Sequence, residues 1–278
     1  MTNSVHTNNS AAIALQNLTR TNDRLGDVQG RISTGLKVQG AKDNAAIWAI
    51  AQGQRADVGA LNAVKQSLDR ATSLADVALS AGESVSDLLN QLKEKVVAAQ
   101  DSSLKTQSRQ LLDNDFKALL RALASQVSNA SFDGGNLLNG SLSVGITFLA
   151  NADASGFVTL TAHDLSLSGS VIELSMSDGL LNLSDAAQTL SRLNNSITQL
   201  NSALGSIGAQ AKQIEAHNNF VTKLMDTLES GIGNLVDADL AKESARLQAL
   251  QVQQQLGAQS LSIANQAPQI ILSLFRGG

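Results

Sequence analysis

The most restrictive feature of this sequence is an unbroken seven-residue repeat of apolar side chains between residues 61 and 99. Side chains spaced alternately three and four residues apart lie along one stripe of an α-helix, and a sustained stripe predicts supercoiled packing against other helices. Every position of the repeat is apolar or Gly: Leu61, Val64, Leu68, Ala71, Ala75, Ala78, Gly82, Val85, Leu89, Leu92, Val96 and Ala99. It covers roughly 60 Å of helix, and a helix of that length requires packing partners.

Two other segments carry the same repeat. The first follows Ala11, Ala14, Leu18, Leu25, Val28 and Ile32, and the second runs from Ala186 to Leu228 with Asn218 as its only polar member. With a shorter apolar face around Phe116, these patterns predict helices over residues 45–100, 104–130 and 185–230, and shorter helices at both ends of the chain. The terminal helices carry mostly small apolar residues, so we expect them to need neighbours in order to pack.

The period changes to two between residues 141 and 176. Val144, Ile146 and Phe148 alternate with other residues, the turn sequence NADASG follows, and a second alternating run begins at Phe157. This pattern predicts a β-hairpin, and residues 171–176 are a candidate third strand. The predicted fold class is therefore mainly α, with long coiled-coil-like helices forming a rod and a small β-hairpin region at 141–176.

Polar, Gly-containing joints separate the terminal helices from the inner ones. The first joint, STGLKVQGAKDNAAIWAI, runs from Ser33 to Ile50. The second, SGIGNLVDADL, contains Gly231 and Gly233. Gly weakens a helix and favours turns, so we expect the inner helices to end at these joints.

The composition argues against several classes of function. The chain has no Cys, so it forms no disulfide, thiolate metal site or cysteine nucleophile. Its formal net charge is -4 with both signs interspersed, and no basic stripe indicates a nucleic-acid partner. No apolar run approaches the roughly 18 residues that a membrane span needs. The N-terminal MTNSVHTNNSAAIALQ lacks the features of a conventional signal peptide.

No pattern indicates an active site. The histidines His6, His163 and His217 are scattered and lack the spacing of metal ligands. Acidic residues stand beside Lys and Arg, as in LKEK, which is typical of solvated helix faces. The Gly-rich DGGNLLNG follows a helix, whereas a phosphate-binding loop follows a strand. We predict a protein that is not an enzyme and takes no cofactor or metal.

Three motifs resemble those of the bacterial flagellins. STGLKVQGAKDNAA is similar to the S-x-G-L-x-x-x-x-A-K-D-x-A-A run near the flagellin N-terminus. FDGGNLLNG resembles a central flagellin segment, and the C-terminal sequence with ANQAPQ and LSLFR is similar to the flagellin C-terminus. Ile47 and Trp48 replace the usual Gly-Leu pair, which suggests a short, α-proteobacterial-type member, and the family's large variable outer domains are missing.

The resemblance implies three regions. Residues 1–44 would be an N-terminal inner-tube helix and spoke, 45–235 the outer rod domain, and 236–278 the C-terminal inner-tube helix. The residues implied for assembly of the inner tube are Leu18, Leu25, Val28, Ile32, Leu247, Leu250, Leu261 and Ile263. Those implied for the spoke and its contacts between subunits are Gly35, Lys37, Lys42, Asp43 and Asn44.

Two further surfaces are suggested within this frame. Uncharged side chains that would face the central channel of the filament are Gln248, Gln251, Gln255 and Gln259, although generic surface glutamines explain them as well. A region where glycans would be tolerated contains Thr159, Thr161, Ser166 and Ser168.

The function implied is that of a flagellin, a structural subunit that assembles with itself, and with sister flagellins where they exist, into the extracellular filament used for swimming. Its other expected partners are hook-associated junction and cap proteins, a secretion chaperone and the flagellar export apparatus, through which it would leave the cell without a cleaved signal peptide. No nucleic-acid or membrane partner is expected. The alternatives are a hook–filament junction protein of the same family and an intracellular coiled-coil scaffold.

Overall fold

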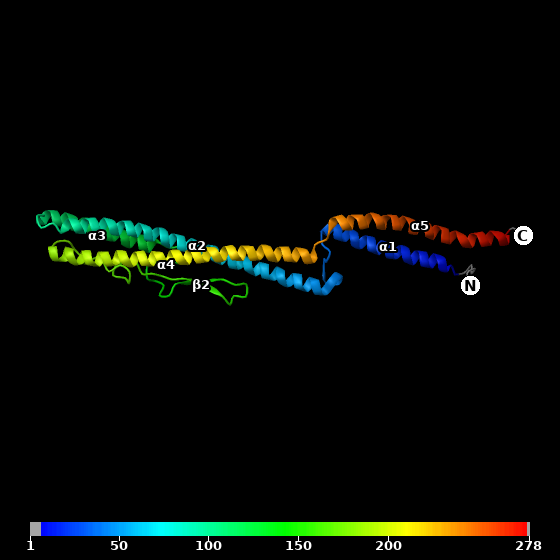
Figure 1. Ribbon diagram of the computed structural model, residues 1–278, viewed down its shortest axis with the longest axis horizontal. Coiled ribbons are helices and arrows are strands. Elements are labelled where there is room, and N and C mark those ends of the chain that lie inside the picture. The colour runs from blue at the N-terminus through cyan, green and yellow to red at the C-terminus, as the bar shows by residue number, and fades with distance from the viewer. Residues whose placement is uncertain (1–6, 277–278) are drawn as a thin grey trace. The chain divides into compact units, whose positions relative to one another are not determined.

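The computed structural model describes residues 7–276, and the side chains of residues 7–266. These residues form five α-helices and one two-stranded sheet (Figure 1). In chain order the elements are α1 (Asn9–Thr34), α2 (Ala41–Ala99), α3 (Thr106–Asn129), β1 (Ile146–Leu149), β2 (Phe157–Leu160), α4 (Leu183–Val236) and α5 (Leu240–Arg276). The predicted class, mainly α with a small hairpin, is confirmed.

The chain divides into two compact units. One unit, which we call the terminal unit, contains the described residues up to Ala56 together with those from Thr227 onward. The other, the inner unit, is the continuous segment Asp57–Asp226. Both α2 and α4 contribute residues to each unit, so these long helices join the two.

The inner unit is built around the predicted repeat of α2. Every member of that repeat from Leu61 to Ala99 is buried, as predicted. Its neighbours are α3 and α4: Lys95 on α2 pairs with Asp115 on α3 at 2.9 Å, and Gly82 lies against Leu204 of α4. Figure 1 shows the three helices side by side. Removing a large aliphatic side chain such as Leu68 from this core costs about 2–5 kcal/mol.

The buried stripe of α4 differs from the predicted repeat by one residue at alternate positions. Residues at every seventh position, such as Leu193 and Leu200, are buried as expected. Between them Thr189, Ser196 and Ala203 are also buried, while the expected seam members Leu190, Ile197 and Leu204 remain partly exposed. Ser196 is satisfied there, because its hydroxyl donates to the Arg192 carbonyl and accepts from the Glu173 amide.

The expectation that Gly231 and Gly233 end the inner helix is wrong. Helix α4 continues through both and ends at Val236. A helical Gly costs only about 1 kcal/mol relative to Ala. Ile232 and Val236 are buried on the same stretch, and this burial offsets that cost.

The hairpin is confirmed, but the candidate third strand is not. Strands β1 and β2 are antiparallel with Phe148 opposite Val158. Residues 171–176 form no strand; Val171, Ile172 and Leu174 are buried as irregular chain. Side chains of the inner helices bond both outer edges of the hairpin. Ser67 of α2 accepts from the Leu149 amide at 3.1 Å, and Gln210 of α4 accepts from the Thr161 amide at 2.9 Å.

The motif FDGGNLLNG contains a cap for α3. The Asn136 amide donates to the Val127 carbonyl at 2.9 Å, near the end of the helix, where carbonyls lack helical partners. Its side-chain oxygen accepts from the Leu138 and Asn139 amides at 2.8 and 3.1 Å. Because Asn136 is buried, these bonds replace the water that it loses on folding.

The close approach of α2 and α4 at Gly82 yields a stability prediction. A Cβ atom at Gly82 would stand 2.2 Å from the Leu204 Cδ2 atom, whereas one at Gly59 would meet nothing within 4 Å. We expect Gly82→Val to destabilise the inner unit by about 1–3 kcal/mol through overpacking. The matched change Gly59→Val should leave it within about 0.5 kcal/mol, since Val is no poorer than Gly in a helix. Urea unfolding followed by circular dichroism measures both, and equal effects would refute this packing.

Candidate functional site: the terminal helix pair

The terminal unit is organised by the packing of α1 against α5. Asn8 donates to the Ala264 carbonyl at 2.7 Å, and Gln254 donates to the Asn22 side chain at 2.8 Å. At the other end the Arg31 guanidinium lies 3.6 Å from Glu243. Residue numbers rise along α1 as they fall along α5, so the two helices are antiparallel.

The line of contact between the helices, here called the seam, contains most of the residues implied for the inner tube. Val28 and Leu250 are buried on it. The other members with intermediate exposure are Leu18, Leu25, Ile32, Leu247 and Leu261. Gly257 lies against Leu18, where its lack of a side chain lets the helices approach. The role of these residues in a filament stays a prediction; the structure shows that they pair α1 with α5 within one chain.

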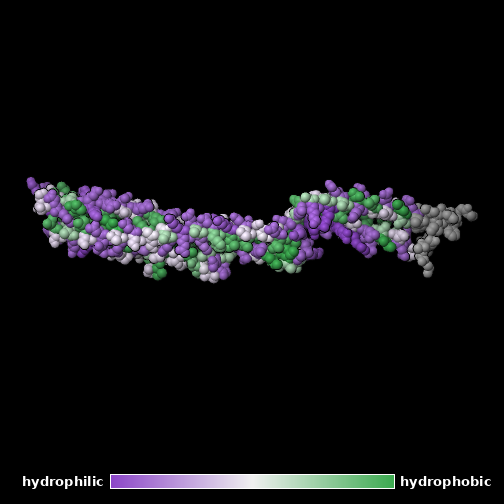
Figure 2. Space-filling model, in the orientation of Figure 1, coloured by the Kyte–Doolittle hydropathy of each residue, from purple (hydrophilic) through white to green (hydrophobic). Residues whose placement is uncertain are grey.

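Ile263 lies elsewhere, on a second apolar stripe of α5. This stripe consists of Ala245, Ala249, Val252, Leu256 and Ile263, each two residues beyond a seam position. Two residues correspond to about 200° around a helix, so the second stripe lies nearly opposite the seam. Val252, Leu256 and Ile263 are 55%, 57% and 64% exposed. Figure 2 shows hydrophobic residues at the surface along α5. The described part of the chain therefore leaves these three side chains uncovered, whereas Ala249, at the edge of the stripe, lines a groove beside the seam.

The two joints pair with each other at the base of the helix pair. Leu36 and Asp237 form an antiparallel bridge. The Lys37 amide donates to the Val236 carbonyl at 2.7 Å, and the Ala238 amide donates to the Gly35 carbonyl at 2.8 Å. Val236 and Val38 are buried beside this contact. The sequence patterns did not predict the bridge, because a single pair of extended residues has no periodic signal.

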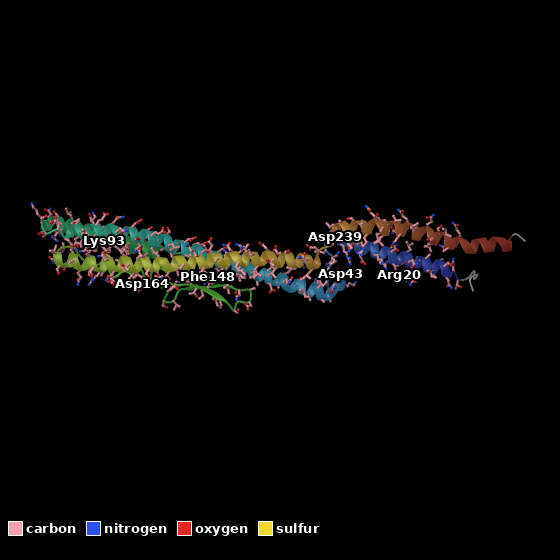
Figure 3. The ribbon with its side chains drawn as sticks, viewed as in Figure 1. Arg20, Asp43, Lys93, Phe148, Asp164 and Asp239 are labelled. Atoms are coloured by element: carbon pink, nitrogen blue, oxygen red, sulfur yellow. The ribbon has the colours of Figure 1, made fainter. Side chains whose placement is uncertain are left out.

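The predicted spoke residues take several roles in this joint. Gly35 ends α1 with φ 72, a left-handed conformation that Gly adopts without strain. Asp43, labelled in Figure 3, accepts from the Gln39 backbone amide at 2.8 Å, and Asn44 accepts from the Ile47 backbone amide at 3.1 Å. Asn44 is non-helical, so it caps the long regular part of α2. Lys37 and Lys42 are exposed. Contacts of any of these residues between subunits are an untested prediction.

The glutamines predicted to face the channel and the hydroxyl residues predicted to tolerate glycans differ in their exposure to solvent. Gln248, Gln251, Gln255 and Gln259 are all exposed; by helical position the first three lie on one side of α5 between the seam and the second stripe, and Gln259 falls within the stripe. Thr159 on β2 and Ser168 are exposed, whereas Thr161 and Ser166 are partly buried. Thr161 and Ser166 also make hydrogen bonds, to Gln210 and Asp164 respectively.

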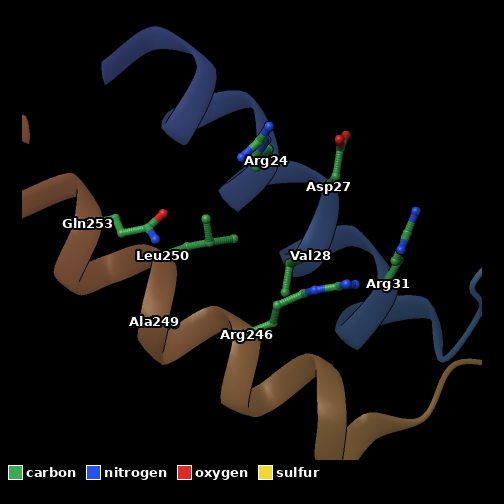
Figure 4. A pocket seen from close by; sticks show the side chains of 8 residues that line it. All are labelled: Arg24, Asp27, Val28, Arg31, Arg246, Ala249, Leu250 and Gln253. Carbon is green, nitrogen blue, oxygen red and sulfur yellow. The ribbon is translucent and has the colours of Figure 1, made fainter. Parts of the chain in front are cut away.

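A groove beside the seam gathers charged side chains. Arg24, Asp27 and Arg31 of α1 and Arg246 and Gln253 of α5 line it (Figure 4). The buried Glu243, which does not itself line the groove, accepts a bond from the Arg246 guanidinium at 3.2 Å. Sequence reasoning missed Glu243, because a Glu in the first turn of a helix is ordinarily read as solvated.

Metal-binding side chains are dispersed in the part of the chain that the structure describes. Within residues 7–266, no three His, Asp or Glu side chains gather where they could hold a metal ion. Burial lowers the pKa of His163, so this imidazole is neutral at pH 7. No helix in the described part of the chain is long and apolar enough to cross a bilayer.

Long paired helices with an uncovered apolar stripe define a class: helical structural proteins whose packing is completed by association. Comparison with known proteins identifies the family. Residues 5–143 match the bacterial flagellin N-terminal helical region, and residues 190–275 match the flagellin C-terminal helical region. The chain belongs to the bacterial flagellin family, whose members are structural subunits of the extracellular flagellar filament.

Individual relatives are similar in sequence along almost the whole chain. Flagellin FljJ of Caulobacter vibrioides is 54% identical over 277 residues, covering 99% of both chains. A flagellin of Brucella melitensis is 39% identical, also covering 99% of both. The expected short, α-proteobacterial-type flagellin is thereby confirmed. A putative flagellar hook-associated protein from Vibrio parahaemolyticus shares the fold, with a TM-score of 0.54 over 70% of this chain and all of that one, at 12% identity.

The cap at Asn44 gives a local test of the joint. We expect Asn44→Ala to remove the hydrogen bond to the Ile47 amide and to weaken the start of the long helix by about 1 kcal/mol. Hydrogen exchange of the peptide containing residues 45–50 should accelerate, while peptides of the inner unit stay unchanged. Asn44→Asp keeps the acceptor and serves as the control. Unchanged exchange in the Ala variant would contradict the capping role.

Proposed function

We propose that this flagellin polymerises through the free faces of its terminal helix pair, and that the second stripe of α5 is its main apolar contact with neighbouring copies. The observation that carries the proposal is the exposure of Val252, Leu256 and Ile263 on a helix whose opposite face is already packed. Monomeric proteins rarely leave such a stripe in water, and contiguous apolar surface marks an interaction site.

The energetics support association through many repeated contacts. Fully burying a Val, Leu or Ile side chain gains about 1.5–3 kcal/mol. Three such residues per copy give several kcal/mol, from which the entropy cost of association must be subtracted. A single contact is therefore modest, and an array in which each copy touches several others is stable. The free faces of α5 and α1 differ in character, so contacts between copies are heterologous, as an open filament requires.

The division of the chain follows from this proposal. Residues 1–44 and 236–278 would form the inner tube and spoke, and 45–235 the outer domain. This division is supported by the seam, which joins the two ends of the chain, and by the paired joints at its base. Lys37 and Lys42 would reach neighbouring copies from the exposed side of the spoke, with Gly35, Asp43 and Asn44 fixing the backbone that presents them.

Two surfaces complete the proposal. Gln248, Gln251 and Gln255 would face the channel, where amides keep the wall wet without holding charged segments of passing chains, and Gln259 would border the second stripe. Glycans would be tolerated in the hairpin region, best at the exposed Thr159 and Ser168; Thr161 and Ser166 belong to the same region but are less accessible.

The partners that we propose are those of a filament subunit. They are sister flagellins in the same filament, junction and cap proteins at its ends, and an export apparatus with a secretion chaperone inside the cell. Flagellin homologues are structural proteins, and we propose no catalytic activity for this one.

Seeded growth tests the proposal against a junction-protein role, for which a likeness of fold is the only support. Heat-dissociated protein is cooled with short filament seeds and followed by negative-stain electron microscopy. Long regular filaments growing from the seeds are expected. Seeds that gain no length, with the protein soluble and folded, would overturn a self-polymerising role.

Substitutions in the second stripe give the matching prediction. We expect the double change Val252→Ser with Leu256→Ser to leave the helical content unchanged, because both side chains already face solvent. The concentration needed for seed elongation should rise at least about tenfold, equivalent to about 1.4 kcal/mol. Leu111→Ser on α3 is the control, since Leu111 is 64% exposed but lies in the inner unit. Normal elongation of the double variant would refute a contact through this stripe.

A further inference from the structure

The groove beside the seam is a candidate second interface of the terminal unit. It is an open hollow of about 390 Å³ between α1 and α5, and we call it the arginine groove. The charged side chains that line it are Arg24, Asp27, Arg31 and Arg246 (Figure 4). We infer that the arginine groove binds carboxylate side chains of a second copy of this chain. The inference rests on the proposed function, and it names the chemistry of a contact that the apolar stripe does not provide.

The first argument is the imbalance of charge in the groove. The groove is lined by three guanidinium groups but by only one carboxylate, that of Asp27. Outside the lining, the Glu243 side chain, 8% exposed, lies 3.2 Å from the Arg246 guanidinium and 3.6 Å from that of Arg31. Glu243 thus compensates part of the positive charge. Counting both carboxylates, the groove still has an excess of positive charge.

The second argument is that two of the guanidinium groups are held by an ion pair, and that none of the three is saturated. Each has five N–H donors in a planar fork. Arg31 and Arg246 share a single oxygen of Glu243, so most of their donors stay free for another acceptor. Arg24 forms no ion pair with any residue that the structure describes. Arg forks bind carboxylates with two parallel hydrogen bonds, and groups already fixed lose less entropy on binding.

The third argument concerns the source of the carboxylates. Among the described residues of the terminal unit, Asp23, Glu229 and Asp237 are exposed and make no salt bridge. Asp23 directly precedes Arg24 and points about 100° away from it on the helix, so it turns away from the groove of its own chain. A second copy offers these carboxylates without that restriction. A basic groove and separate acidic positions on one chain are complementary in the heterologous sense that a filament requires.

A charge reversal with a matched control tests the inference. Arg24→Glu places a like charge in the groove, whereas Arg20→Glu makes the same change in net charge one turn earlier on α1 (Figure 3), outside the lining. We expect Arg24→Glu to raise the concentration needed for seed elongation about tenfold at 0.1 M salt, and Arg20→Glu to raise it less than about twofold. The difference should shrink at 0.5 M salt, because exposed charges are screened. Both variants should keep wild-type helical content.

Cross-linking identifies the occupant. The chain has no Cys, so Gln253→Cys places a single thiol in the groove for a benzophenone–maleimide label. Filaments are grown from a mixture of isotopically light and heavy subunits, irradiated and analysed by mass spectrometry. Mixed light–heavy products joining the groove to a peptide with Asp23, Glu229 or Asp237 support the inference. Products within one chain alone, or joined to a different flagellar protein, overturn it.

The outcomes separate this inference from the proposed function. Wild-type protein that fails to elongate seeds refutes polymerisation itself. Wild-type protein that elongates while Arg24→Glu elongates as well as Arg20→Glu refutes the groove alone.

Discussion

The structure depends on one requirement: a long helix is stable in water only where its apolar stripe is covered. In the inner unit the requirement is met within the chain, since the repeat of α2 from Leu61 to Ala99 is fully buried. In the terminal unit it is met on only one side. Helix α1 has a single stripe and α5 has two, so pairing them covers the seam and leaves the second stripe in solvent.

This asymmetry explains how one chain combines an inner unit whose apolar stripes are covered with a terminal unit that leaves one apolar stripe exposed. The inner unit fixes its geometry with close contacts such as Gly82 against Leu204, and with polar ties from Ser67 and Gln210 to the hairpin. The terminal unit has few buried side chains, and its polar contacts, such as that between Arg31 and Glu243, set the register of α1 on α5. Register matters for assembly, because it decides which residues of each copy are presented together to the next.

Much of the fold follows from periodicity alone, since a seven-residue repeat and a two-residue alternation are properties of local sequence. The long helices, the α1 residues of the seam and the hairpin were predicted in this way, whereas the α5 residues of the seam were implied by the resemblance to flagellins. Local sequence did not predict the places where a residue's own conformational preference is opposed by burial or by the lack of a pairing partner. Gly231 and Gly233 suggested a break, but burial of Ile232 and Val236 keeps α4 helical; residues 171–176 alternate like a strand, but they have no strand beside them to pair with. The bridge from Leu36 to Asp237 and the buried Glu243 depend on chain segments about 200 residues apart, a separation beyond the reach of local patterns.

The most direct test of the account is the solvent accessibility of the second stripe before and after assembly. Because the chain has no Cys, Val252→Cys introduces a single thiol at a position that is 55% exposed in the isolated chain. Its rate of reaction with a small maleimide is measured in soluble protein and in seeded filaments that contain a small fraction of the variant. The account predicts a rate at least about tenfold slower in filaments, as expected when an exposed side chain becomes buried. An equal rate in filaments and soluble protein would show that α5 keeps this face in water, and would contradict the central claim.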